Sequence, residues 1–345
     1  MNNNLFIDGV LMQVHVAYWS GAKALSAEDL GLDTEKISKT FNLGKKFLVP
    51  REVVANFRRI EGQARKLVED NSFNFPIGSA NFVTQKSFEK VEKKLRELKE
   101  VYLAAAEELI LNFEEHKLAV RPDYINAAQQ AFSNASYGIT GGLDQDLEAS
   151  LEQGLQAFTD SFLARIEAHY PKAEDLRKKF SLDWNIYEVA APRLTESDAA
   201  TVIQNGSERE ATLANARAQM SQKIGGFIAD VVSVLRTETN EVCSKIVTSI
   251  KEGKVIKSST IGALKNFIER FKDMNFIGDK TIEDQLESVR KELLDAYPSE
   301  TFKDNMETRA ELGRRLAIIV EETEKLTSAD ISKVTGEYHR KINWE

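Results

Sequence analysis

Apolar residues recur at alternating steps of three and four positions along two long stretches of the chain. The first stretch runs through Phe88, Val91, Leu95, Leu98, Tyr102, Ala105 and Leu109, and the second through Leu213, Arg217, Met220, Ile224, Phe227, Val231 and Val234. A mean spacing of about 3.5 residues keeps one stripe of a helix against a partner helix. These two seams therefore predict long helices, over residues 84–117 and 207–252, that lie against other helices.

The remaining periodic segments predict shorter helices. They cover residues 51–70, 122–136, 144–170, 260–273, 281–296 and 300–326, and a last one runs from Ser328 to about His339. Pro122 is expected to begin its helix, because proline is tolerated in a first helical turn. Thr84 is expected to cap the first long helix and Gly253 to end the second. Gly225 and Gly226 are expected to weaken or bend the second long helix.

The first part of the chain is less helical. Residues 10–19 alternate with a period of two, which predicts a strand, and a half-buried helix over the same residues is the alternative. Phenylalanines at 73, 75 and 82 fall in a loop, where they favour a small hairpin. Ser26-Ala-Glu-Asp29 predicts a short capped turn, and residues 181–194 a connector or a small packed corner.

Composition agrees with a folded, mainly helical chain. Of the 345 residues, 42% are apolar and 29% are charged, while only 6 are proline. The expected fold class is all-α: an elongated helical bundle with long coiled-coil-like helices and a small β-hairpin in the N-terminal half. We expect an N-terminal helical region at 1–182, a connector at 183–206 and a long-helix region at 207–345. A single continuous bundle is the alternative.

Net charge and cysteine content limit the expected partners and the cellular compartment of the protein. The net charge of −8 argues against a general nucleic-acid coat, although a local basic face is compatible with it. The single cysteine, Cys243, has no partner for an internal disulfide, which favours a reducing compartment such as the cytoplasm. The chain shows neither a signal peptide nor an apolar run of the roughly 20 residues that a bilayer requires. No membrane association is expected.

No catalytic or cofactor motif is recognisable. Gly44-Lys45-Lys46-Phe47 lacks the first glycine and the Ser or Thr of a phosphate-binding loop. Glu114-Glu115-His116 places its side chains about 100° apart on a helix, and Val120 stands where a helical zinc motif needs a second ligand. We therefore expect no cofactor, no metal and no enzymatic activity.

Two groups of residues are candidates for binding. Arg58 and Arg59, with the loop residues Phe73, Phe75 and Phe82, are candidates for contact with a protein partner. The alternative for the phenylalanines is packing into the end of the bundle. The basic stretch contains Lys86, Lys90, Lys93 and Lys94, which are candidates for nucleic-acid contact. Interleaved glutamates favour local charge pairing instead.

Three segments carry a resemblance to a known family. They are Ala17-Tyr-Trp-Ser-Gly-Ala-Lys-Ala-Leu-Ser-Ala-Glu-Asp-Leu-Gly-Leu32, Phe75-Pro-Ile-Gly-Ser-Ala-Asn-Phe82 and Thr260-Ile-Gly-Ala-Leu-Lys-Asn-Phe-Ile-Glu-Arg-Phe-Lys-Asp-Met-Asn-Phe276. Together they resemble domain of unknown function 3150, a family of helical proteins carried by bacteria, phages and plasmids. Members tend to be encoded near MoxR-type AAA+ ATPases and von Willebrand factor A-like proteins. The resemblance implies a protein partner and supplies no catalytic residues.

The sequence thus favours a non-enzymatic helical assembly or adaptor protein. Its expected partner is a protein, either a second copy of the chain or an AAA+ ATPase. The alternative is a nucleic-acid-associated phage or plasmid protein that uses the basic face around residues 86–99. Membrane insertion in the manner of helical pore-formers is disfavoured, because the chain has no long apolar hairpin.

Overall fold

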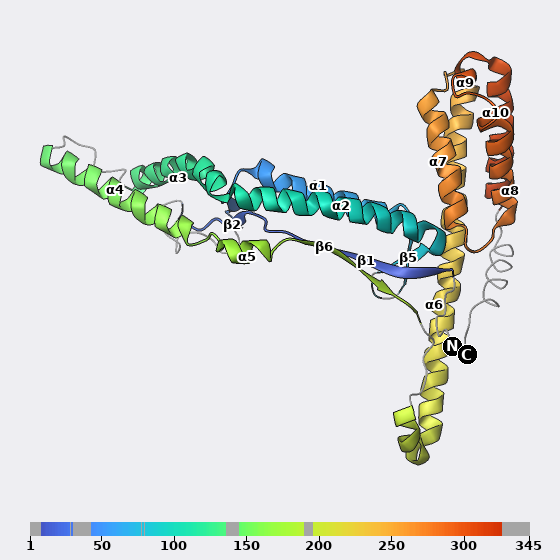
Figure 1. Cartoon of the computed structure of the whole chain (residues 1–345), viewed down its shortest axis with the longest axis horizontal. Helices are drawn as coiled ribbons and strands as arrows, with labels where there is room; N and C mark the ends of the chain where they lie inside the picture. Colours follow the sequence, from blue (N-terminus) through green and yellow to red (C-terminus); the bar gives the residue numbers. More distant parts are fainter. Residues whose placement is uncertain are drawn as a thin grey trace. The chain divides into compact units, whose positions relative to one another are not determined.

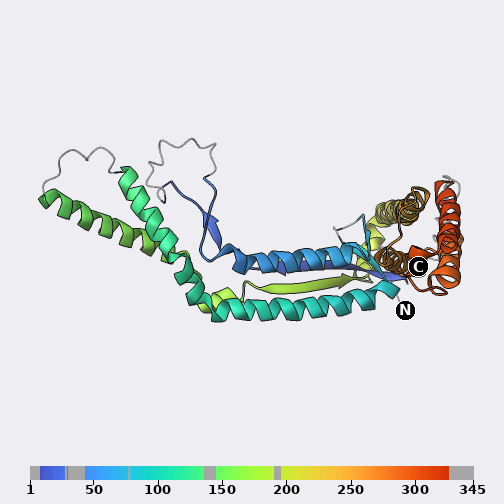
Figure 2. The same cartoon turned by 90° about the horizontal axis from the view of Figure 1, so that it is seen from above.

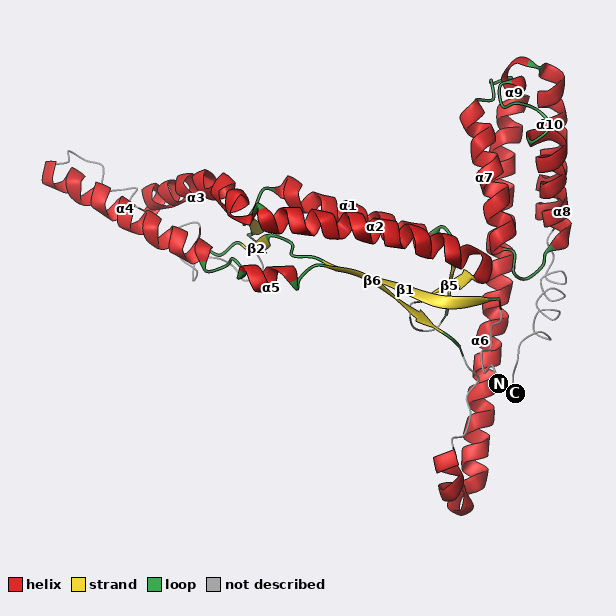
Figure 3. Cartoon of the chain, viewed as in Figure 1, coloured by secondary structure: helices red, strands yellow, loops and turns green. Residues whose placement is uncertain are grey.

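The computed structural model of the chain describes residues 8–27, 29, 43–76, 78, 80–135, 145–189 and 196–325. Figure 3 shows that helices predominate over strands. The expected helix from Ser328 to His339 lies outside the described residues. The mainly helical class with a small hairpin is confirmed.

Contacts within the chain divide it into two compact units. Unit 1 comprises residues 1–13, 66–94 and 184–345, and unit 2 comprises residues 14–65 and 95–183. The expected connector at 183–206 contains one point where the chain passes between units. The other crossings fall inside elements predicted as continuous, namely the first strand and the helices near residues 65 and 94.

Unit 1 is built around helix α6, Glu196–Lys251. Helices α7 (Ser258–Met274) and α10 (Met306–Glu324) run beside its C-terminal half, and α8 (Lys280–Val289) and α9 (Thr301–Asp304) complete the group (Figure 1). The buried face of α6 carries Ile224, Phe227, Ile228, Val231, Val232 and Leu235. Val234, assigned to the second seam, is 43% exposed, so that seam is wrong at this position. The helix continues through Gly225 and Gly226.

Two further features of unit 1 concern helix boundaries. A π-helical turn, Arg290–Leu294, follows α8 directly. The single helix expected over 300–326 is instead divided into α9 and α10. Asn305 makes the division, since its side chain accepts hydrogen bonds from the backbone N–H groups of Glu307 and Thr308 and so caps α10.

The strand predicted near residue 10 is confirmed as β1, Gly9–Ala17. The hairpin is confirmed too: β4 (Phe73–Asn74) pairs antiparallel with β5 (Asn81–Thr84), and β5 pairs antiparallel with β1 in the register Gly9 to Thr84. The order of the sheet is β4-β5-β1-β6. Strand β6, Ser181–Tyr187, lies in the stretch expected to be a connector or a small packed corner, where no strand was predicted.

Unit 2 combines long helices with an aromatic core. Helix α1 (Arg51–Glu69) and helix α2 (Gln85–Leu111) contribute their parts in this unit, followed by α3 (Phe113–Ala135), α4 (Gln145–Glu167) and α5 (Ala173–Arg177). Strands β2 (Ala22–Ala24) and β3 (Lys45–Phe47) form a separate hairpin. Figure 2 shows α3 leaving α2 at an angle and α4 returning beside α3.

The first seam, on α2, packs against strand residues as well as against a helix. Tyr102 is buried, its ring meets Phe57 of α1 edge-on at 5.3 Å, and its hydroxyl donates to the carbonyl of Ala17 at the end of β1. Phe57 also contacts Phe180, which precedes β6, at 5.0 Å. An aromatic layer between helix and strand therefore takes the place of a purely helical partner.

The boundary between α2 and α3 differs from the prediction. Helix α2 ends at Leu111 instead of about Lys117, and Pro122 lies inside α3 instead of at its start. The chain turns at Asn112, which keeps helix-type backbone bonds on both sides, from its own N–H to Glu108 and from the His116 N–H to its carbonyl. The helix start predicted from Pro122 is therefore wrong by two helical turns or more.

No helix in the described part of the chain is long and apolar enough to cross a bilayer.

Candidate functional site

The predicted aromatic loop is part of the core of unit 1. Phe73, Phe75 and Phe82 are each at most 5% exposed. The ring of Phe75 meets Phe227 of α6 at 5.1 Å, and the ring of Phe82 meets Phe276, which follows α7, at 4.9 Å. Because they are covered, these three side chains offer no free surface to a partner. Packing into the helical group, the other alternative, is what the structure shows.

The predicted arginine pair lies in the other unit. Arg58 and Arg59 are exposed on α1, and Arg59 donates to the side chain of Asn56 at 2.7 Å. They belong to unit 2, whereas the phenylalanines belong to unit 1. The five candidate residues for a protein partner are therefore not one cluster within a unit.

The basic stretch remains on the surface of α2 in unit 1. Lys86, Lys90, Lys93 and Lys94 are all exposed, and the ammonium of Lys90 is 2.5 Å from the carboxylate of Asp273 on α7. That surface ion pair partly neutralises one of the four predicted lysines.

The other ionisable residues considered, Lys117 with its glutamates and Cys243, are held in ion pairs or buried in the structure. Lys117 forms ion pairs with Glu114 and with Glu167 of α4. Cys243 is buried, and this burial raises the pKa of its thiol to about 12, so that the reactive thiolate is scarce at neutral pH. Among the described residues, no group of three or more His, Cys, Asp and Glu side chains is arranged to hold a metal ion.

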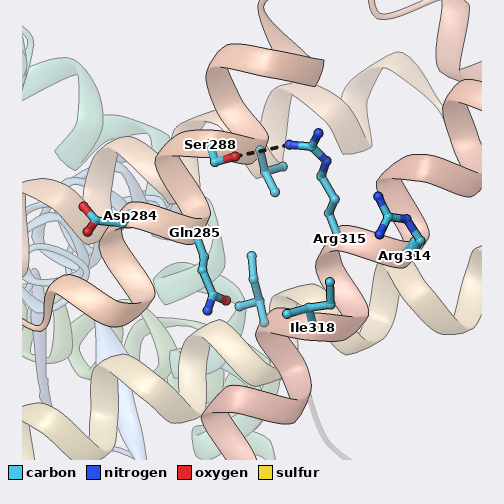
Figure 4. Close-up of a pocket in the computed structure, with 8 residues that line it drawn as sticks. Asp284, Gln285, Ser288, Arg314, Arg315 and Ile318 are labelled. Atoms are coloured by element: carbon cyan, nitrogen blue, oxygen red, sulfur yellow. Dashed lines mark hydrogen bonds between the residues drawn. The ribbon is translucent and has the colours of Figure 1, made fainter.

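A groove between α8 and α10 in unit 1 is the strongest candidate site (Figure 4). Its volume is about 370 Å³. We call it the α8–α10 groove and define it by the residues that line it: Asp284, Gln285, Ser288, Val289, Arg314, Arg315, Ile318 and Ile319. Val289 and Ile319 are buried, whereas Ile318 remains 48% exposed. The groove therefore offers an apolar surface with polar groups around it.

Arg315 is held across the groove. Its guanidinium donates to the hydroxyl of Ser288 on α8 at 3.2 Å, as Figure 4 shows. It also donates to Glu292 in the π turn and to Glu311 one turn back on α10, both at 2.7 Å. Three partners on two sides fix this long side chain, so the wall of the groove is ordered before any ligand arrives.

Glu311 joins the two arginines. Arg314 donates to its carboxylate through two nitrogens, at 2.9 and 2.8 Å, and Arg315 adds a third bond. These hydrogen bonds lower the pKa of Glu311 to about 2. The hydrogen bond from Arg315 likewise lowers the pKa of Glu292. Both carboxylates are therefore ionised at neutral pH and neutralise the arginines locally.

A second cavity, of about 600 Å³, continues along the same helix. It is lined by Leu293, Tyr297, Asn305, Glu307, Thr308, Ala310, Glu311 and Arg314, and it shares Arg314 with the α8–α10 groove. Glu307, Glu311, Arg314 and Ile318 are spaced by three or four residues and form one stripe of α10. The opposite wall advances by fours from Gln285 through Val289 and Leu293 to Tyr297, passing through the π turn.

Gln285 has an unsatisfied atom in the groove. Its side-chain oxygen is buried and has no hydrogen-bond partner among the described residues. Figure 4 shows this side chain reaching from α8 into the space that Ile318 faces from α10. A buried acceptor without a donor costs roughly 1–3 kcal/mol. Because this oxygen is closed to solvent, a donor from a ligand reaches it only if the side chains that cover it move.

Sequence reasoning did not find this groove. Its two walls are separated by more than 20 residues, and no periodic pattern in the sequence places them side by side. The exposure of Ile318 depends on how α10 is rotated against α6 and α8. Glu311, Arg314 and Arg315 are spaced for local pairing on a helix, but such spacing is common on solvated helices and does not indicate a site.

Comparison with known proteins gives a family and no activity. Residues 8–303 match the model of a family described as a protein of unknown function, DUF3150. The resemblance noted in the three sequence segments is thereby confirmed. No curated protein and no solved structure matches the chain.

Proposed function

Because the chain belongs to the DUF3150 family of proteins of unknown function, we propose a function from its own geometry: a non-enzymatic helical adaptor that binds another protein through the α8–α10 groove. We place this activity in the cytoplasm of a bacterial host. The groove, more than any of the residues singled out in advance, carries the proposal.

The observation behind the proposal is the exposed Ile318 beside ordered arginines. Protein interfaces concentrate apolar side chains at the centre, and arginine is enriched among the residues that contribute most to binding. Ile318 is 48% exposed next to buried Val289 and Ile319, and Arg315 is already fixed by its three partners. A partner side chain would bury this apolar surface without first ordering the groove, which lowers the entropic cost of binding.

The family resemblance suggests where to look for the partner. A MoxR-type AAA+ ATPase encoded near such proteins is the first to test, and a second copy of this chain is the second. The α8–α10 groove is compatible with either, because the features named so far recognise an apolar group and not a particular protein.

A pull-down from the native host, with and without ATP, tests the adaptor function. The bait variants are the wild type, Ile318→Asp and Val255→Asp. Val255 is 54% exposed and lies outside both cavities, so it receives the same charge without touching the groove. We expect a stoichiometric protein with the wild type and Val255→Asp, and about tenfold less of it with Ile318→Asp, which matches a loss of about 1.4 kcal/mol.

Two outcomes would contradict the proposal. One is capture of the partner that Ile318→Asp leaves unchanged, and the other is recovery of the bait alone as a monodisperse monomer. Thermal unfolding of each bait, followed by circular dichroism, confirms that the substitution at a half-exposed position leaves the fold intact. The absorbance ratio of the eluate at 260 and 280 nm reports nucleic acid, the alternative partner.

A further inference from the structure

We infer that the segment bound in the α8–α10 groove is basic: a lysine or arginine of a partner helix, flanked by aliphatic residues. This inference rests on the proposed function and adds to it the chemical class of the partner. Three properties of the groove lead to it, namely its charge balance, its unsatisfied acceptor and the shape of its apolar surface.

The charge balance of the groove and its immediate surroundings is negative. Arg314 and Arg315 outnumber Asp284 in the lining of the groove, but Glu311 and Glu292, which lie outside that lining, neutralise both arginines through bonds of 2.7–2.9 Å. Asp284 is exposed, and its carboxylate forms no ion pair or hydrogen bond with a described residue. Glu307 adds a further carboxylate in the second cavity. An acidic segment would meet these carboxylates, whereas a basic one would pair with them.

The unsatisfied atom is an acceptor and therefore selects a donor. The buried oxygen of Gln285 can be satisfied only by an N–H or O–H group. Lysine and arginine side chains carry donors and no acceptors, whereas an ionised carboxylate carries acceptors only. The same position therefore disfavours an ionised aspartate or glutamate and is compatible with a donor such as lysine or arginine.

The apolar surface suits the stem of a basic side chain. Lysine and arginine lay their methylene groups along apolar surfaces and keep the charged end among polar groups. Val289, Ile318 and Ile319 would cover the stem, and Gln285 and Asp284 would meet the charged end. The stripe of α10 from Glu307 to Ile318 extends for roughly 16 Å, so a partner helix of about three turns would span both cavities.

Synthetic peptides test the chemistry directly on the full-length protein. We would use three fluorescein-labelled, N-acetylated amphipathic helices of about 14 residues. They share one leucine pattern and carry lysine, glutamine or glutamate at the same remaining positions, and a scrambled lysine peptide serves as a fourth. Fluorescence anisotropy at about 0.15 M salt, where surface attraction is largely screened, gives each dissociation constant. We expect the lysine peptide to bind at least about tenfold more tightly than the other three.

Variants separate the groove from general attraction to a protein of charge −8. Ile318→Asp adds a negative charge, so non-specific attraction predicts tighter binding of the lysine peptide, whereas the groove predicts about tenfold weaker binding. Val255→Asp adds the same charge elsewhere and is expected to leave the dissociation constant within about twofold. Asp284→Asn and Gln285→Leu are each expected to weaken binding by about three- to tenfold, because each removes one acceptor.

Several results would overturn the inference. They are equal or tighter binding by Ile318→Asp, preference for the glutamate peptide, equal binding of the scrambled peptide, and absence of binding by all four peptides. The proposed function is judged separately, by the pull-down. If Ile318→Asp abolishes capture of a partner while the lysine peptide fails to bind, the adaptor function stands and the basic chemistry is wrong.

Discussion

At the scale of single residues, the structure shows where the chain needs a particular side chain. Gly253 has φ of +70° and ends α6 as predicted, and the N–H of Lys254 reaches back to the carbonyl of Ser249. Ser26 and Asp29 bond each other's backbone N–H groups, as their spacing predicted. Thr84 caps α2 by accepting from the N–H of Ser87. Local hydrogen bonds of this kind depend on neighbours in sequence.

Gly9 is required by a contact that lies far away in sequence. A Cβ atom at this position would lie 2.5 Å from the carbonyl oxygen of Val83 and 2.5 Å from the ring of Phe82. Because the carbonyl belongs to the paired strand β5, the backbone itself would have to shift. We expect Gly9→Ala to lower the free energy of unfolding by about 1–3 kcal/mol.

Gly226→Ala is the matched control for Gly9→Ala. Gly226 is exposed inside α6, and a Cβ atom there would meet nothing within 4 Å. Alanine at this position is expected to stabilise the protein by about 0.5–1 kcal/mol, because glycine is a poor helix former. Urea unfolding of both variants checks the pair, and equal effects of the same sign would contradict the argument.

At the scale of elements, a buried ion pair links α6 to the loop between α7 and α8. The guanidinium of Arg236 donates to the carboxylate of Asp279 at 2.7 Å, and both side chains are less than 10% exposed. The side-chain oxygen of Asn275 accepts from the backbone N–H of Asp279, and its amide nitrogen donates to Glu283 of α8. The position of α8, and with it one wall of the groove, depends on this network.

Removing one partner of this pair leaves a buried charge. We expect Arg236→Met to cost about 3–5 kcal/mol of unfolding free energy, because Asp279 then has no counter-charge. The double variant Arg236→Met with Asp279→Ala is expected to lose less than Arg236→Met alone, since no unpaired charge remains. Urea unfolding measures the wild type, the single variants Arg236→Met and Asp279→Ala, and the double variant. A double variant as unstable as the sum of the two single variants would show that the residues act independently.

The carboxylate of Glu311 makes the arginine network on α10 sensitive to acid. Hydrogen bonds from Arg314 and Arg315 place its pKa in the folded protein at about 2, below the ordinary value of 4.5. A lowered pKa means that the contribution to stability is complete above about pH 4.5 and is lost as pH falls towards 2. We expect the difference in melting temperature between the wild type and Glu311→Gln to shrink over this interval.

Thermal unfolding in buffers between pH 7 and pH 2 measures that difference. Glu115→Gln is the control, because Glu115 is exposed on α3 in the other unit and outside this network. A difference between the wild type and Glu311→Gln that stays constant down to pH 2 would show that the arginine contacts do not contribute to stability.

At the scale of the whole molecule, each unit is assembled from segments that are distant in sequence. Residues 1–13, 66–94 and 184–345 form unit 1, so its core needs three parts of the chain at once. Phe73 and Phe82 come from the second of these parts, and Phe227 and Phe276 come from the third. The phenylalanines of the aromatic loop therefore pack two segments of unit 1 together, and their side chains are not a surface for a partner.

The charge of the whole molecule bears on the nucleic-acid alternative. With a net charge of −8 and Lys90 paired to Asp273, we expect no binding of a labelled DNA duplex at about 0.15 M salt, where surface attraction is largely screened. Fluorescence anisotropy checks this for the wild type and for the triple variant Lys86→Glu, Lys93→Glu, Lys94→Glu. Binding that weakens with salt and disappears in the triple variant would support the basic face as a nucleic-acid site.

Local signals in the sequence determined most elements of this protein. The alternation in residues 10–18, the phenylalanine hairpin, the helix near 258–274 and the caps at Thr84 and Gly253 are all present in the structure. These features depend on side-chain periodicity and on hydrogen bonds between neighbours, which a linear pattern records. The proline at 122 misled because an interior proline and a helix-starting proline look alike until the flanking turns are seen.

Only the tertiary structure decided which apolar residues are covered. The second seam was predicted with Val234 inside, but Val234 is exposed in the structure, whereas Val232 and Leu235 are buried. The exposure of Ile318 and the isolation of the Gln285 oxygen likewise depend on which side chains of α8 and α10 cover each other. A periodic pattern specifies a stripe on a helix, but what covers that stripe is decided by segments far away in the chain.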